Sequence, residues 1–309
     1  MNPVNTEPYN LPSDATWLIT GCSSGIGKAL CTLIAAKPGH RLIATARNPA
    51  DLAYLPSDDQ RILKLPLDVT SAASVDAAFA AAESHFGPGL RLDVVVNNAG
   101  YSLSGDTESA TEHETHREME TLFFGTARVT TRAVENMRRP DDRDRDLHRG
   151  GLVFNVSSLA GQCGFPGHAY YHAGKWAVEG WTESVAREMH PRWKINFCIL
   201  QPSGVRTHFE GHSKARTAPH PAYAGADMPA RVLDRYVEMG IRSGALIEPA
   251  AVAEAVYGIA SRGERVPLRV PLGGPAWNFI RTKFELGLAG LDEVKAVSMS
   301  VQRALGASK

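Results

Sequence analysis

Short apolar segments alternate with longer segments of helical period along most of this chain. The apolar segments are continuous rather than interleaved with polar residues, and residues that favour turns bound each of them. Continuous apolar runs indicate strands that are buried on both faces, which is typical of a parallel sheet with helices on each side. Strands are expected at residues 16–20, 41–46, 61–68, 92–97, 151–157 and 194–200, and the clearest helices at residues 71–85, 112–137 and 169–190. This order predicts an α/β fold with a doubly wound parallel sheet.

Two segments interrupt the alternation. Residues 138–151 are charged and rich in turn formers, which indicates a solvated loop. The stretch from His208 to about Gly244 shows no clear period, and a long irregular segment in a compact α/β domain is typical of a lid or binding loop. We therefore expect a leader at residues 1–14, a single domain over residues 15–275 with a substrate lid at about 208–245, and a C-terminal helical extension at residues 276–309.

Charge and cysteine content narrow the functional classes. Lys+Arg and Asp+Glu number 33 each, so the chain has no net charge and no electrostatic signature of nucleic-acid or anionic-membrane binding. The four cysteines show no CxxC spacing, and the N-terminus has neither a basic region nor an apolar run. No apolar stretch is long enough to span a bilayer. We expect reduced thiols and a cytoplasmic location.

A glycine-rich turn, TGCSSGIG, follows the first predicted strand. Its spacing differs from the common GxGxxG fingerprint, but the physical logic is the same. Gly21 permits a tight turn, Gly25 lets the backbone approach a phosphate, and Gly27 allows a helix to pack closely on the strand. Because the N-terminus of a helix attracts anions, this turn predicts a site for the pyrophosphate of a dinucleotide.

A tyrosine and a lysine share one face of the predicted helix at residues 169–190. Tyr171 and Lys175 are four residues apart and lie one turn apart on the same side, whereas Tyr170 points well away. Such a pair is most often an ordinary helix face, and a serine after a strand is most often a turn residue. A shared catalytic role becomes credible only when these residues follow a dinucleotide turn.

Six motifs in order resemble the short-chain dehydrogenase/reductase family. They are TGCSSGIG, LDVT at 67–70, NNAG at 97–100, NVSS at 155–158, YHAGK at 171–175 and PSGVRT at 202–207, and the similarity runs from about Thr16 to about Leu272. The resemblance implies a Rossmann-like fold, a nicotinamide cofactor and a small-molecule ketone or alcohol as substrate. It also implies a homodimer or homotetramer built on the helices at 112–137 and 169–190.

The resemblance implies that Ser158, Tyr171 and Lys175 are catalytic. In the family the serine lies thirteen residues before the tyrosine, which selects Ser158 over Ser157. Tyr171 would exchange a proton with the substrate oxygen while a hydride moves between nicotinamide and carbon. Lys175 would stabilise the phenolate form of the tyrosine, and Ser158 would hydrogen-bond and orient the substrate oxygen.

The cofactor site is expected to discriminate in favour of NADP(H). At the end of the second strand, where NAD-binding members carry a carboxylate, this chain has Ala46 followed by Arg47, and an arginine accommodates a 2′-phosphate. NAD(H) stays the less favoured alternative, since Arg47 could be an ordinary solvated residue. The residues implied in cofactor binding are Gly21, Ser23, Ser24, Gly25, Ile26, Gly27, Arg47, Asp68, Val69, Asn98, Ala99, Gly100, Tyr171, Lys175, Pro202, Val205 and Thr207.

Side chains near the predicted site suggest a medium to large, partly apolar substrate. The lid carries His208, Phe209, His212, His220 and Tyr223, and Gln162, Cys163, Phe165 and His168 follow Ser158. These histidines lack a carboxylate partner at helical spacing, so we expect them to line the substrate pocket or face solvent, and we expect no metal site.

One departure from the family keeps other functions open. The family commonly has an asparagine that holds a water linking the lysine to solvent, and the matching residue here is Leu122. The leading prediction is an NADP(H)-dependent oxidoreductase, either a carbonyl reductase (ketoreductase) or a secondary alcohol dehydrogenase. The alternatives are a non-redox lyase, isomerase or cyclase on the same fold, and an NADP(H)-binding regulatory protein with little turnover.

Overall fold

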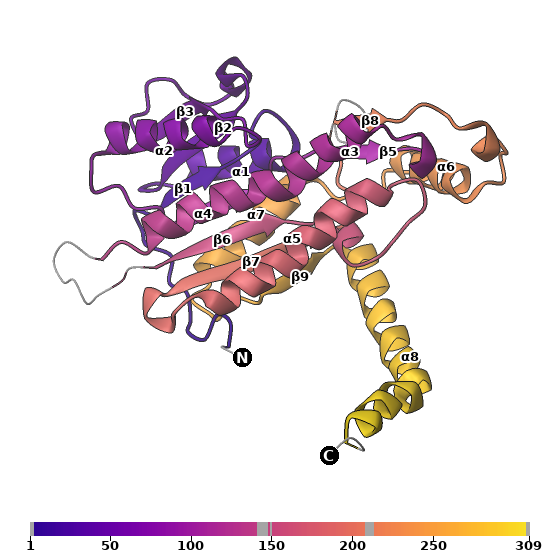
Figure 1. Cartoon of the computed structure of the whole chain (residues 1–309). Coiled ribbons are helices and arrows are strands. Elements are labelled where there is room, and N and C mark those ends of the chain that lie inside the picture. The colour runs from indigo at the N-terminus through magenta and orange to yellow at the C-terminus, as the bar shows by residue number, and fades with distance from the viewer. Residues whose placement is uncertain (1–2, 141–147, 149, 208–212, 307–309) are drawn as a thin grey trace.

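A parallel sheet forms the centre of the molecule (Figure 1). The computed structural model describes residues 3–140, 148, 150–207 and 213–306, and in this part of the chain the strand order is β3-β2-β1-β4-β6-β7-β9. The strands are β1 Thr16–Ile19, β2 Arg41–Ala46, β3 Ile62–Pro66, β4 Val94–Asn97, β6 Gly151–Val156, β7 Ile195–Pro202 and β9 Arg269–Leu272. All six expected strands are present. The short strand β9 was not expected, because it is only half-buried and contains Pro271.

Helices cover both faces of the sheet, as the continuous apolar runs predict. The helices are α1 Gly25–Ala35 and α7 Pro249–Ser261 on one face, and α2 Ala72–Phe86, α4 Gly125–Met137 and α5 Ala169–Glu188 on the other. Strand β1 shows the reason, because Trp17 and Ile19 enter the first core and Leu18 enters the second. Each such side chain stabilises the fold by about 1.5–3 kcal/mol. The doubly wound, Rossmann-like class is confirmed.

The expected helix at residues 112–137 is present but contains an irregular turn. It consists of α3 Glu112–Met119, a π-helical turn at Glu120–Phe124 and then α4. A capping box between Thr111 and Glu114 begins α3. π turns inside helices are frequent at functional sites, which draws attention to the residues on this turn.

The N-terminal leader is docked on the molecule. Asn5 is buried, and its side-chain amide donates to the carbonyls of Phe197 (2.7 Å) and Val266 (2.8 Å), while its Oδ1 accepts from the amide of Phe197 (3.0 Å). The Tyr9 hydroxyl donates to the carbonyl of Asp93 at 2.9 Å. The leader therefore satisfies backbone groups of β7 and of the segment that precedes β9.

An Asn5→Ala variant is expected to lower the free energy of unfolding by about 2–3 kcal/mol, because it leaves three buried backbone groups without partners. Urea denaturation measures the loss. Asn10→Ala is the matched control, since Asn10 is exposed and should change stability by less than about 0.5 kcal/mol. Equal midpoints for the two variants would show that the Asn5 contacts do not hold the leader.

The segment expected to be an irregular lid contains regular structure. The part at residues 208–212 lies outside the described residues, but β8 Lys214–Arg216 pairs with β5 Ser102–Ser104, and α6 spans Pro229–Arg242. Val232, Tyr236 and Met239 recur at helical spacing on an exposed face of α6. The irregular interpretation was wrong, because prolines and glycines on both sides obscure a helical period of only 14 residues.

The C-terminal helix α8, Gly274–Gly306, extends away from the body of the molecule (Figure 1). Near its start, the ammonium of Lys283 contacts the carbonyl of Gln162 and lies 3.8 Å from the centre of the Trp176 ring. Farther along, Leu286 and Leu291 are exposed. Among the described residues, no helix combines the length and the apolar character that crossing a bilayer requires.

Candidate active site

The carboxyl edge of the sheet between β1 and β4 is the point where the strand order changes direction. β1 pairs with β2 on one side and with β4 on the other, so the connections leave toward opposite faces. In open α/β sheets, ligands bind in the crevice that such a switch point creates. The predicted functional residues can therefore be judged by their position relative to this crevice.

Of the two serines after β6, only Ser158 is partly exposed. Its Oγ accepts a hydrogen bond from the amide of Ala160 at 3.1 Å, which begins a 3-10 turn at Leu159–Gly161. Ser158 is half-buried, whereas Ser157 is 2% exposed and turned inward. Ser158 is therefore the more accessible of the two serines, and its catalytic role stays a prediction.

Tyr171 and Lys175 lie on the same buried face of α5. The Lys175 Nζ is 5.8 Å from the centre of the Tyr171 ring. Tyr171 belongs to a small apolar cluster with Ala160 and Leu122, so its ring packs against the turn that Ser158 begins. Tyr170 is half-buried and is not part of this cluster. The packing of α5 on the turn after β6 therefore places Tyr171 and Lys175 beside the turn that Ser158 begins.

The ammonium of Lys175 is buried beside the end of β6. Its Nζ donates to the carbonyl of Val156 at 2.7 Å, and the side chain is almost inaccessible. Burial lowers the pKa of Lys175 to about 8, and the negative charges of Glu118 and Glu179 act in the opposite direction. A lysine whose pKa lies this close to neutrality can respond to small changes in its surroundings.

Glu179, one turn after Lys175, anchors a buried polar network that the sequence reasoning missed. Its carboxylate accepts from Gln162 (3.0 Å), from Gln201 (2.9 Å) and from the guanidinium of Arg269 (2.8 Å). The second arm of Arg269 binds Glu183 at 2.8 Å. The network joins α5 to β7, β9 and the turn after Ser158. The only signal in the sequence is the four-residue spacing from Lys175 to Glu179.

The glycine-rich turn after β1 fits tightly against two other predicted cofactor segments. A Cβ atom added to Gly21 would lie 2.8 Å from the Cα of Ala99, and Gly21 has φ +70°, a conformation that L side chains rarely adopt. A Cβ atom added to Gly25 would lie 2.9 Å from the Thr207 Cγ2. Only glycines let these segments approach so closely. The resulting cradle of bare backbone at the N-terminus of α1 suits a dinucleotide pyrophosphate.

Hydrogen bonds hold the NNAG turn against the first turn. The Asn98 amide donates to the carbonyls of Thr20 and Gly21, both at 3.0 Å. In return, the Thr20 hydroxyl accepts from the backbone amides of Asn98 and Ala99, both at 3.0 Å. Four hydrogen bonds over so short a span make the floor of the crevice rigid before any ligand binds.

A second layer of polar side chains lies beneath this floor. The Asn97 amide donates to Thr130 and to Asn155, both at 2.8 Å, and the Asn155 amide donates to Thr182 at 2.8 Å. These residues come from β4, α4, β6 and α5. The network therefore fixes the two strand ends of the site relative to the helix that carries Tyr171.

The remaining predicted cofactor residues lie at or after the carboxyl ends of strands, or at the start of α1. Arg47 is exposed directly after the buried Ala46, at the carboxyl end of β2. The Asp68 carboxylate accepts from the amide and hydroxyl of Thr70, so it shapes its own turn, and Val69 is buried. Ser23, Ser24 and Ile26 lie at the start of α1, Pro202 ends β7, and Val205 bridges to Ile247.

Leu122 lies on the π turn and closes one side of the site. It is 1% exposed, and its Cδ2 lies 2.9 Å from the position that a Cβ on Gly100 would occupy. The Lys175 Nζ lies 3.9 Å from the same position. An apolar side chain therefore occupies the neighbourhood of the lysine in which the family usually has an asparagine.

The residues expected to line a substrate pocket are only partly brought together. His208, Phe209 and His212 lie outside the described residues. The His220 backbone amide donates to Asp106 at 3.0 Å and the Tyr223 hydroxyl contacts Glu108, so both residues are held on the segment after β5. Phe165 packs edge-on against Phe279 of α8. In the described part of the chain, no group of three or more His, Cys, Asp or Glu side chains is placed to hold a metal.

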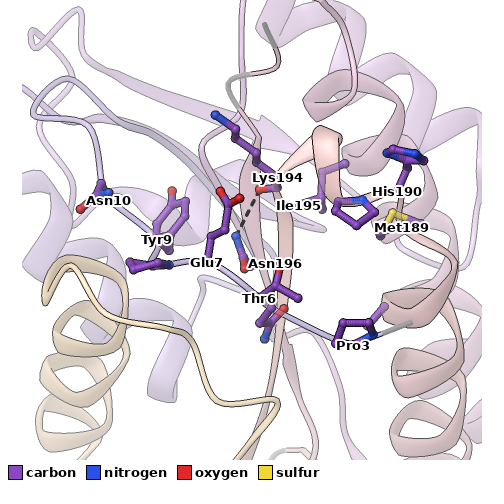
Figure 2. Close-up of a pocket in the computed structure, with 14 residues that line it drawn as sticks. Pro3, Thr6, Glu7, Tyr9, Asn10, Met189, His190, Lys194, Ile195 and Asn196 are labelled. Carbon is purple, nitrogen blue, oxygen red and sulfur yellow. Dashed lines mark hydrogen bonds between the residues drawn. The ribbon is translucent and has the colours of Figure 1, made fainter. Parts of the chain in front are cut away.

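The pocket in Figure 2 is distant from these residues. It has a volume of about 250 Å³ and lies between the docked leader and residues 186–196. Lys194 and Ile195, which line it, lie at the amino end of β7. Since Ser158 and the glycine turn follow the carboxyl ends of their strands, this pocket is at the opposite edge of the sheet and carries no part of the candidate site.

A doubly wound sheet with this crevice and a tyrosine–lysine face beside it defines a dinucleotide-binding class of oxidoreductase. The family model described as short chain dehydrogenase matches residues 15–218. The chain belongs to the short-chain dehydrogenase/reductase family, whose members act on alcohol and carbonyl groups with nicotinamide cofactors.

Individual relatives support this assignment. The chain is 60% identical over 298 residues to oxidoreductase calM of Penicillium decumbens, covering 96% of each chain. It resembles a short-chain dehydrogenase from Streptomyces avermitilis with a TM-score of 0.80 and 32% identity, covering 93% of this chain and 99% of that one. It also resembles an alcohol dehydrogenase from Thermococcus sibiricus, solved with 5-hydroxy-NADP, with a TM-score of 0.63 and 25% identity, covering 84% and 95%.

Proposed function

We propose that the protein is an NADP(H)-dependent carbonyl reductase or secondary alcohol dehydrogenase that acts on a medium to large, partly apolar small molecule. The observation that carries this proposal is the packing of Tyr171 and Lys175 against the turn of Ser158, at the same edge of the sheet as the glycine turn after β1. The similarity to an alcohol dehydrogenase solved with an NADP derivative supports the cofactor class.

Each residue of the trio has a distinct role in this proposal. When bound, the nicotinamide supplies the hydride for reduction or accepts it in oxidation. Tyr171 donates a proton to the substrate oxygen in reduction and removes it in oxidation. Ser158 hydrogen-bonds the same oxygen, and the positive charge of Lys175 stabilises the phenolate form of Tyr171. The buried face of α5 excludes water from the proton transfer.

An assay of NADPH consumption with ketones that differ in size and polarity tests the reaction class. We expect turnover of partly apolar ketones and, in the reverse direction, NADP⁺ reduction by the matching secondary alcohols. Reactions without ketone control for unproductive oxidation of the cofactor. NADPH binding without turnover of any ketone or alcohol would contradict the oxidoreductase assignment.

An Arg47→Ala variant is expected to weaken NADPH binding by about 10-fold or more, because a charge-assisted hydrogen bond to the 2′-phosphate contributes roughly 1.5–3 kcal/mol. NADH lacks this phosphate, so its dissociation constant should stay nearly unchanged. Fluorescence titration of both cofactors measures the two constants. Arg41→Ala, an exposed arginine at the amino end of the same strand, is the matched control. An unchanged NADPH-to-NADH ratio in Arg47→Ala would count against the proposed preference.

Leu122 favours a second candidate function, an NADP(H)-binding regulatory protein with little turnover. The apolar side chain cannot hold a water beside Lys175 as the family's asparagine does. A Leu122→Asn variant distinguishes the two functions. A wild type that binds NADPH but turns over slowly, together with a variant that gains rate, would support the regulatory function, whereas a fast wild type excludes it.

We also propose that the protein is a homodimer or homotetramer built on α5 and on the helical segment of α3, the π turn and α4, and that it is cytoplasmic. Phe124, which ends the π turn before α4, and Trp176 on α5 are 47% and 46% exposed, and Phe123 packs edge-on against Trp181. Large exposed aromatic side chains are typical of association surfaces. Light scattering on the purified protein measures the number of subunits.

A further inference from the structure

A buried carboxyl group lies in the last turn of α3 and has no role in the proposed reaction so far. Glu118 is completely inaccessible to solvent. Its Oε1 accepts a hydrogen bond from the amide of Leu103 at 3.0 Å, but its Oε2 makes no hydrogen bond within the described part of the chain. An ionised carboxylate is costly to bury unless other charges or donors compensate it. The surroundings of Glu118 therefore decide whether it carries a charge.

Titratable groups from three elements act on Glu118. Lys175 on α5 is the cation whose charge favours the ionised carboxylate. Tyr101, on the segment before β5, has a raised pKa because its phenol is buried and because the Glu118 carboxylate lies beside it, and Tyr101 in turn favours the ionised form of Glu118. Arg117 and Glu114 of α3 act on Tyr101 from outside. Glu118 and Lys175 are therefore two buried groups of opposite charge on helices that pack together, and each acts on the pKa of the other.

Leu122 follows Glu118 by one turn and occupies the place beside the lysine. Its Cδ2 and the Lys175 Nζ both lie within 4 Å of the position that a Cβ on Gly100 would occupy. Because leucine has no polar side-chain group, residue 122 can neither accept a hydrogen bond from the lysine nor donate one to a water. Glu118, one turn before Leu122, supplies the polar group that residue 122 lacks.

We propose that Glu118 is a positioning residue for the reaction, whose negative charge keeps Lys175 in its ammonium form in place of the solvent link that the family's asparagine provides. This inference rests on the proposed function, since Lys175 affects turnover only if Tyr171 is the acid and base. Glu118 acts through Lys175 and does not touch the substrate. The family position that changed and the group that compensates for it lie on the same face of one helix.

The ionisation of both groups falls in the range in which an oxidoreductase works. Burial raises the pKa of Glu118 to about 7, against the opposing effects of the Leu103 amide, the Lys175 charge and the Tyr101 hydroxyl. Burial lowers the pKa of Lys175 to about 8, and Glu118 is the first of two carboxylates that oppose this. Above the pKa of Glu118 its negative charge is present and supports the ammonium. Removing that charge must therefore lower the pKa of Lys175 further.

A Glu118→Gln variant tests the role, because glutamine keeps the shape and the acceptor for the Leu103 amide but cannot ionise. In the oxidative direction, with a secondary alcohol that the wild type turns over, the alkaline limb of kcat/KM should move to lower pH by about one unit. Glu112→Gln, an exposed glutamate in the first turn of α3, should keep the wild-type profile. An unshifted alkaline limb in Glu118→Gln overturns the inference.

The double variant Glu118→Gln, Leu122→Asn provides a rescue experiment. If Glu118 replaces the function of the family's asparagine, restoring the amide should return the alkaline limb toward the wild-type pH. A purely structural role of Glu118 predicts no such recovery, because the asparagine would only add a polar group to a buried site. If the alkaline limb is shifted in Glu118→Gln but does not recover in the double variant, the charge of Glu118 acts on Lys175 without replacing the family's asparagine. That result would overturn the proposed replacement.

A measurement without substrate separates the inference from the proposed function. Because the native pKa of Glu118 is raised from 4.5 to about 7, the native state holds a proton that the unfolded state releases, so this group lowers stability as the pH rises across that interval. The urea midpoint of Glu118→Gln should therefore rise relative to wild type between about pH 4.5 and 7, and a constant difference overturns the inference. If Tyr171→Phe is as active as wild type, the proposed function fails instead.

Discussion

A Tyr171→Phe variant is expected to lose about 10³-fold in kcat/KM while binding NADPH as tightly as the wild type. The change removes one hydroxyl group and leaves the ring that packs against Ala160 and Leu122. The fold and the cofactor crevice should therefore be preserved, whereas the proton donor is lost. Initial rates with a ketone that the wild type reduces, together with fluorescence titration of NADPH, measure both effects.

Tyr170→Phe is the matched control for this experiment. It removes the same hydroxyl from the neighbouring residue, which is half-buried and lies outside the apolar cluster that contains Tyr171. We expect activity within about twofold of the wild type, because a side chain 100° farther around the helix cannot reach the same substrate oxygen. Comparable losses in both variants, or no loss in Tyr171→Phe, would refute the acid–base assignment.

An Arg269→Ala variant is expected to lower the free energy of unfolding by about 3–5 kcal/mol, because it leaves the Glu179 carboxylate buried without its cation. Glu179 is 3% exposed and binds Arg269 at 2.8 Å, and the second arm of the guanidinium binds Glu183. Gln162 and Gln201 still donate to Glu179 in the variant, which favours the lower end of the range. Urea denaturation at neutral pH measures the loss.

Arg281→Ala controls for the removal of an arginine from an ion pair. Arg281 binds Glu285 at 2.7 Å on the surface of α8, where both side chains are well exposed, so the expected loss is below about 1 kcal/mol.

The stability loss in Arg269→Ala should also depend on pH. Hydrogen bonds from Arg187 and Arg269 hold the pKa of Glu183 below its ordinary 4.5, so the stability that this carboxylate contributes is present above 4.5 and is lost as the pH falls through its native pKa. If the difference in the free energy of unfolding between wild type and Arg269→Ala does not shrink in acid, the stabilising role of the Glu183 carboxylate is contradicted.

The six expected strands and the helix carrying Tyr171 could be predicted because their signals are local. Continuous apolar runs report burial on both faces, and the spacing of Tyr171 and Lys175 reports a shared helix face. The serine required more, because Ser157 and Ser158 are adjacent and no local pattern separates them. The family spacing selected Ser158, and the structure buries Ser157 and leaves Ser158 partly exposed at the start of the following turn.

The polar groups around Lys175 could not be predicted in this way. Arg269 lies 90 residues from Glu179 in the sequence, and its short strand is half-buried and contains a proline. Glu118 falls among other charged residues of α3, where nothing distinguishes the one carboxylate that packing buries from those that face solvent. The helix α6 was missed for a related reason, since flanking prolines and glycines conceal a short period.

By itself, the sequence determined the order of the first six strands of the sheet and the main helices between them, the glycine turn after β1 and the face shared by Tyr171 and Lys175, because each depends on residues within a few positions of one another. Only the tertiary structure decided which charges surround Lys175, how Leu122 fills the space beside it, and that the leader is bound through Asn5. Electrostatic energies depend on burial and on distance in space, and both are set by the packing of segments that lie far apart along the chain.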